Sequence, residues 1–218
     1  KINEDVVIPL DRLAEYEEGI ERINIEYSIR NKLDIAAAVR DYVATLSASP
    51  VLRPTAETGD ETDTLVADKV RAALALLDRV TAGWRKLLDA LDAPAESQRE
   101  LLDAAAGHVQ SGDRVLNLLL RRELRVSYRA EVERPLKGIF TGRELDPIHQ
   151  ELDRIHTRMR SGRLFVATHM HAGDGNVHTN IPVNSNDYAM LHEADRIVAR
   201  VMRLARDLGG VISGEHGI

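Results

Sequence analysis

Hydrophobic residues recur along the chain with two different periods, one typical of strands and one typical of helices. The dominant pattern changes near residues 28 and 161. Residues 5–9 are a β-branched run ended by a proline, which is typical of a strand. Helical spacing follows directly, at Leu13, Tyr16, Ile20 and Ile23. The first part of the chain therefore predicts one strand followed by one helix.

Residues 28–160 are dominated by apolar positions at steps of three and four, which predict amphipathic helices. A helix is expected over 28–48, a long one from about Thr64 to Pro94, one or two over 98–136, and a last one over 146–160. This stretch contains no Gly-rich phosphate loop and no cluster of histidines. It predicts a helical hairpin or small bundle whose charged positions are solvated helix faces.

After Gly162 the pattern returns to short strands. Residues 164–168 and 177–183 are strand-like, residues 187–208 have helical spacing, and residues 211–213 are strand-like again. The order outside the helical middle is β-α-β-β-α-β, the split βαβ order of ferredoxin-like folds. We therefore predict an α+β protein with a discontinuous ferredoxin-like domain of residues 1–27 and 161–218, interrupted by a helical insertion of residues 28–160. The competing interpretation is a helical interaction module that carries an incidental small sheet.

Composition narrows the function classes. The 218 residues carry a formal net charge of −6, which argues against a general nucleic-acid binder. The chain has no cysteine, so disulfides and thiolate metal sites are excluded, and no apolar run approaches the roughly 20 residues that span a bilayer. We expect a cytoplasmic protein. Because the chain starts at Lys1 and stops inside a motif-like run, we also expect it to be a fragment of a longer polypeptide.

The candidate chemistry lies in residues 169–180 and 213–218, which are rich in His and Gly. A loop between two strands would bring His171 and His178 to facing strand ends, and Glu215 could complete a two-His, one-carboxylate metal set. Such a set leaves coordination positions open for a substrate. Two alternatives stay open, a hairpin with hydrogen-bonded imidazoles and a metal-dependent hydrolase that uses the same residues with a bound water. His169 alone is interpreted as an ordinary polar strand residue.

Two segments resemble a known family. Residues 171–178 read His-Ala-Gly-Asp-Gly-Asn-Val-His, and residues 209–218 read Gly-Gly-Val-Ile-Ser-Gly-Glu-His-Gly-Ile. Both are similar to the C-terminal cap domain of FAD-linked oxidases, the flavoenzymes that include D-lactate dehydrogenase, the glycolate oxidase flavin subunit and D-2-hydroxyglutarate dehydrogenase. Residues 3–13 look like the first strand and helix of the same domain. The resemblance implies oxidation of a D-2-hydroxy acid, such as D-lactate or glycolate, to the 2-oxo acid.

The resemblance also implies roles for individual residues. His171, His178 and Glu215 would bind a divalent metal, commonly zinc or manganese in metal-using members. Asn180 would contact the substrate, and His216 would be the catalytic base. FAD would be held mainly by a separate N-terminal domain that is missing here, so the fragment alone is expected to be inactive. Two further expectations concern the full-length protein: an electron-transfer partner, and a peripheral position at the inner membrane.

Overall fold

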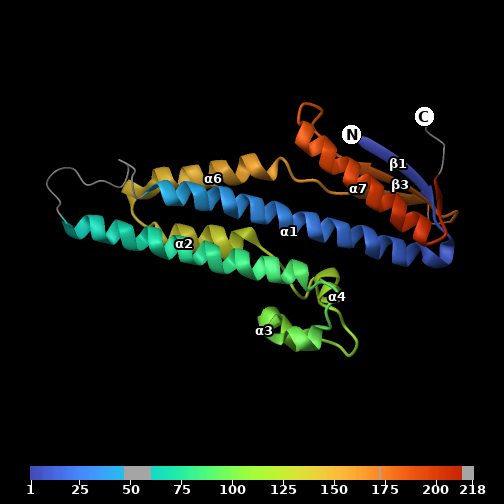
Figure 1. Ribbon diagram of the computed structural model, residues 1–218, viewed down its shortest axis with the longest axis horizontal. Helices are drawn as coiled ribbons and strands as arrows, with labels where there is room; N and C mark the ends of the chain where they lie inside the picture. Colours follow the sequence, from blue (N-terminus) through green and yellow to red (C-terminus); the bar gives the residue numbers. More distant parts are fainter. Residues whose placement is uncertain (47–59, 172, 213–218) are drawn as a thin grey trace. The chain divides into compact units, whose positions relative to one another are not determined.

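The computed structural model describes residues 1–46, 60–171 and 173–212 (Figure 1). The chain divides into two compact units, one of Lys1–Ser28 with Gly162–Ile218 and the other of Ile29–Ser161. We call them the sheet unit and the helical unit. The roles expected for them, a cap domain and an insertion, remain predictions.

The described part of the sheet unit contains four strands and two α-helices. Its strands are β1 (Ile2–Val7), β2 (Ala167–His171), β3 (Asn176–Ile181) and β4 (Val211–Ile212), and its helices are the first part of α1 (Leu13–Thr45) and α7 (Tyr188–Asp207). The sheet order is β2-β3-β1-β4, with every neighbouring pair antiparallel. Strands β1 and β2 are therefore parallel with β3 between them, and β3 and β4 are parallel with β1 between them. This is the split βαβ arrangement, so the predicted α+β, ferredoxin-like class is confirmed. It does not fit an incidental sheet on a helical module.

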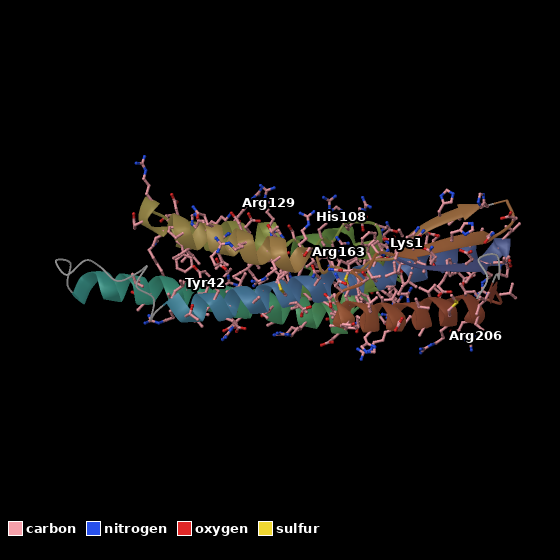
Figure 2. All side chains as sticks on the ribbon, turned by 90° about the horizontal axis from the view of Figure 1, so that it is seen from above. Lys1, Tyr42, His108, Arg129, Arg163 and Arg206 are labelled. Atoms are coloured by element: carbon pink, nitrogen blue, oxygen red, sulfur yellow. The ribbon has the colours of Figure 1, made fainter. Side chains whose placement is uncertain are left out.

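One face of this sheet packs against α1 and α7. The side chains that form the core come from the strands (Val6, Val177, Ile181), from α1 (Tyr16, Ile20, Ile23) and from α7 (Ala194, Ile197, Val201). Figure 2 shows the strands on one side of this unit and α7 on the other, with Arg206 pointing away from the sheet. The period-2 strands and period-3.6 helices thus supply one apolar layer each, as their sequence patterns require.

A polar side chain fixes the start of β2. The Asn24 amide nitrogen donates to the carbonyl of Val166 at 3.0 Å, and its carbonyl oxygen accepts from the Val166 N–H at 2.8 Å. Both backbone groups of Val166 are satisfied in this way just before the strand begins. Helix α1 therefore positions the segment that leads into His169 and His171.

Helix α7 lies within the stretch 187–208 that has helical spacing, and both of its ends are capped. Asp187 is the N-cap, and its carboxylate accepts from the Met190 N–H at 2.9 Å. At the other end Gly209 has φ +76°, and Gly210 N–H donates to the carbonyl of Ala205 at 2.8 Å. This left-handed C-terminal residue turns the chain back towards β4.

Several boundaries differ from the sequence prediction. Residues 13–45 form one continuous helix rather than two, because no Gly or Pro interrupts the chain between Ile23 and Ser28. Strand β1 begins at Ile2, earlier than expected, and β2 begins at Ala167, later than expected. The region 98–136 is divided into short pieces instead of one or two helices. Residues 47–48, placed in the predicted second helix, lie outside the described residues.

The helical unit is built from the second part of α1 with α2 (Asp60–Asp89), α3 (Arg99–Leu102), α4 (Val115–Leu120), α5 (Arg134–Ile139) and α6 (Asp146–Arg160). Short turns of 3₁₀ or π type connect them at Ala95–Gln98, Asp103–His108, Arg129–Glu133 and Arg143–Leu145, and Leu10–Arg12 is a similar turn before α1. Trp84 of α2 is buried and donates from its indole nitrogen to Glu131 at 2.9 Å. None of the described helices is both long and apolar enough to cross a membrane.

Candidate functional site

The face of the sheet opposite the two helices carries a different set of side chains. Alternation along the strands assigns to it Asn3, Asp5 and Val7 of β1, Asn176, His178 and Asn180 of β3, and Ala167, His169 and His171 of β2. We call this the open face. Burial along β3 follows the two faces of the sheet. The open-face residues are half-buried, whereas Val177, Thr179 and Ile181 are buried on the core side.

Three imidazoles gather on the open face. His169 lies directly opposite His178 in the β2–β3 register, and their ring centres are 6.4 Å apart. His171 pairs with Asn176, yet its ring centre is 5.6 Å from that of His178 and 5.5 Å from that of His169. The structure therefore brings His171 and His178 close together, as expected, and adds His169 to them.

The hairpin loop explains how His171 and His178 come together. The Asp174 N–H donates to the carbonyl of His171 at 3.1 Å, and the Asn176 N–H donates to the Asp174 carboxylate at 3.1 Å. Gly175 has φ +76°, and an added Cβ there would lie 2.2 Å from the carbonyl oxygen of Ile8. A glycine is needed at this turn both for its backbone angle and for the close approach of Ile8, the residue that follows β1. The loop and β1 thus fix the hairpin register.

His178 is held by a carboxylate from the neighbouring strand. Asp5 lies opposite His178 in the β1–β3 register, and its Oδ1 is 2.8 Å from Nδ1 of the imidazole. The Asp5 side chain is 4% exposed and that of His178 is 23% exposed. Sequence reasoning missed Asp5, although a carboxylate inside a β-branched strand was a visible signal, because such a residue needs a partner when it is buried.

Of the other predicted site residues, Asn180 is described by the structure and Glu215 and His216 are not. Asn180 lies on the open face two residues beyond His178, opposite Asn3 and Ala167. Glu215 and His216 lie outside the described residues, so their roles stay predictions. In the sequence they follow β4, which pairs with β1 beside Asp5.

The open face fits part of a metal site. Among the described residues, no three His, Asp or Glu side chains are arranged to hold a metal ion. Two imidazoles that share one zinc ion at about 2.1 Å have ring centres roughly 5 Å apart. The 5.6 Å between His171 and His178 is close to this value. Metal-bound imidazoles also usually donate their second nitrogen to a carboxylate, as the His178 contact with Asp5 allows. The pair therefore fits two ligands of a site whose further ligands come from elsewhere.

The C-terminal third of the chain is similar to a known protein family. Residues 144–218 match the family described as FAD linked oxidases, C-terminal domain. This part of the chain is therefore similar to the C-terminal domain of FAD-linked oxidases. The match covers α6, β2, β3, α7 and β4, and the open-face histidines lie inside it.

Two curated relatives are similar over a shorter segment. They are the glycolate oxidase subunit GlcD of Escherichia coli strain K12 and the subunit of the same name from E. coli O6:H1 strain CFT073, each 42% identical over 55 residues. The aligned segment is 25% of this chain and 11% of each relative. No solved structure matches the chain.

Proposed function

We propose that this chain supplies the substrate and metal side of an FAD-dependent oxidoreductase that oxidises a D-2-hydroxy acid, such as glycolate or D-lactate, to the 2-oxo acid. The family match of residues 144–218 supports FAD as the cofactor, and the similarity to a glycolate oxidase subunit supports the substrate class. The observation that carries the proposal is the pairing of His171 and His178 on the open face, with Asn180 beside them.

Each residue has a stated task in this proposal. His171 and His178 bind a divalent metal, zinc or manganese, together with Glu215. Asn180 orients the substrate, because an amide can both donate to and accept from a hydroxy acid. His216 takes the proton from the 2-hydroxyl group. A bound metal would supply the charge that lowers the pKa of that hydroxyl, and a bound flavin would supply the acceptor for the hydride.

The helical unit is proposed to serve a partner rather than the chemistry. The site residues named above all lie within residues 162–218 of the sequence, and the helical unit contributes none of them. An electron-transfer protein that reoxidises the flavin is the partner we propose for the whole enzyme.

Flavin reduction tests the proposed function. The polypeptide that contains this chain together with an FAD-binding domain is mixed anaerobically with glycolate or D-lactate, and the flavin absorbance is followed. We expect bleaching with a D-2-hydroxy acid, and its loss in His171→Ala and His178→Ala. The control is His192→Ala, an exposed histidine on α7. Absence of bleaching with every 2-hydroxy acid would contradict the proposal and favour the hydrolase alternative. Bleaching that survives both substitutions would contradict the roles proposed for His171 and His178.

A further inference from the structure

Asp5 is a buried carboxylate on a face of the sheet that otherwise carries exposed or half-buried side chains. Its side chain is 4% exposed, and its position in β1 lies between Glu4 and Val6, which point to the core side. Burying a carboxylate is costly unless hydrogen bonds replace its lost hydration. Oδ1 has such a bond with His178 at 2.8 Å.

The backbone fixes this pair. Asp5 and His178 are register partners on adjacent antiparallel strands, and His178 is also the register partner of His169 on β2. The imidazole of His178 therefore stands between a carboxylate on one neighbouring strand and an imidazole on the other. Directly opposite residues on neighbouring strands have Cβ atoms about 5 Å apart, so the pairing does not depend on a flexible loop.

The contact selects one tautomer of the imidazole. In its carboxylate form Asp5 can only accept hydrogen bonds, so Nδ1 of His178 must carry the proton that it shares with Oδ1. In the neutral ring the other nitrogen, Nε2, then carries the lone pair. A free neutral imidazole prefers the opposite form, with the proton on Nε2, so the preference would be reversed by the protein.

We propose that Asp5 is a positioning residue that holds His178 in the Nδ1–H tautomer and keeps Nε2 available as a ligand on the open face. This inference rests on the proposed function for its purpose, because it names the group that prepares His178 to bind the metal. Asp5 itself is not a ligand. Carboxylates that orient a ligating histidine typically change metal affinity 10- to 100-fold when they are removed.

Two measurements on the 218-residue chain test the proposal. The tautomer of His178 is read from the two ring-nitrogen shifts in a long-range ¹H–¹⁵N spectrum, without metal and at a pH where the ring is neutral. Zn²⁺ affinity is measured by competition with a chromogenic chelator. The variant is Asp5→Asn, which keeps the side-chain shape but can also donate to Nδ1. The matched control is Glu4→Gln, the same type of change one residue away on the other face of β1.

We expect the Nδ1–H form in the wild-type chain and in Glu4→Gln, and a substantial Nε2–H population in Asp5→Asn. Zn²⁺ affinity should fall about 10- to 100-fold in Asp5→Asn and stay unchanged in Glu4→Gln. The Nε2–H form in the wild-type chain would overturn the proposal, and this reading needs no folded variant. An unchanged tautomer together with unchanged Zn²⁺ affinity in Asp5→Asn would also overturn it.

Failure of the proposed function has a different signature. If the wild-type chain binds no Zn²⁺ but shows the Nδ1–H tautomer, and Asp5→Asn changes that tautomer, then the positioning role of Asp5 stands and the metal role of His178 does not. If Zn²⁺ binds to the wild-type chain through an Nε2–H ring, Asp5 has no positioning role although the metal assignment survives.

Discussion

Asp5 and His178 are hydrogen-bonded across 173 positions of sequence, because β1 and β3 are neighbours in one antiparallel sheet. The helical unit lies between these strands in the chain. The family match begins only at residue 144, yet β1 is the strand that joins β3 to β4. The candidate site therefore depends on a segment at the start of the chain as well as on the matched region.

A fragment of residues 162–218 should not form the sheet, because it lacks the strand between β3 and β4. We expect poorly dispersed amide resonances from this fragment in an ¹H–¹⁵N spectrum. Adding a peptide of residues 1–28 should restore dispersion, since it supplies β1 and the α1 residues of the same core. A fragment that is already well dispersed on its own would show that β1 is dispensable.

Gly175→Ala should destabilise the hairpin by more than about 2 kcal/mol, because a left-handed residue with a Cβ is strained and the added atom would collide with the Ile8 carbonyl. Gly173→Ala in the same loop is the control. Its added Cβ would meet no atom within 4 Å, so its unfolding free energy should change by about 0.5 kcal/mol or less. Urea denaturation measures both. Equal effects of the two substitutions would mean that the turn does not need a glycine at position 175.

Two tyrosines on α1 should respond oppositely to removal of their hydroxyl groups. Tyr16 is fully buried, burial raises the pKa of its phenol, and its hydroxyl has no hydrogen-bond partner among the described residues. Tyr16→Phe should therefore leave the unfolding free energy unchanged or raise it by about 1 kcal/mol. Tyr27 donates to Glu193 at 2.6 Å, so Tyr27→Phe should lower the unfolding free energy by about 1 kcal/mol. A clear loss in Tyr16→Phe would reveal a hydrogen bond at that hydroxyl.

Stability should fall in acid partly through Glu26. Burial raises the pKa of this carboxyl, but hydrogen bonds from Arg200 and Arg22, with their charges, outweigh it and hold the pKa below its ordinary value of 4.5. The folded state binds the proton less readily than the unfolded state. The stabilisation is therefore complete above pH 4.5 and is lost as the pH falls through the lower, folded-state pKa.

Denaturant titrations of the wild type and Glu26→Gln over a series of pH values test this effect. The difference in unfolding free energy between the two proteins should be largest near neutral pH and should shrink as the pH falls below 4.5. A difference that stays constant down to the acid limit would mean that the two arginines do not stabilise the charged form of Glu26.

Much of the fold could be predicted from periodicity. Helix α6 has the predicted bounds, and α7 lies within the predicted residues 187–208, because apolar residues at helical spacing mark these helices directly in the sequence. The prediction of two helices over residues 13–48 was wrong, because a change in the hydrophobic pattern does not by itself end a helix. Strand ends were shifted because pairing partners, which decide where a strand begins, lie far away in the sequence.

The candidate site was only partly predictable. The loop glycines indicated that His171 and His178 would meet, and the structure places their rings 5.6 Å apart. The positions of Asp5 and His169 depend on the register of β1 and β2 against β3, which no local pattern specifies. Burial of Asp5 follows from that register as well, so its partner could not be named from the sequence.

We propose that His171, His178 and Glu215 bind a catalytic metal on the substrate side of a flavin-dependent oxidoreductase. Elemental analysis of the polypeptide that contains this chain and an FAD-binding domain tests it most directly. We expect about one divalent ion per flavin in the wild type and in His192→Ala, and loss of most of it in His171→Ala, His178→Ala and Glu215→Ala with folding retained. Metal content at the wild-type level in all three variants would show that these residues do not bind the metal.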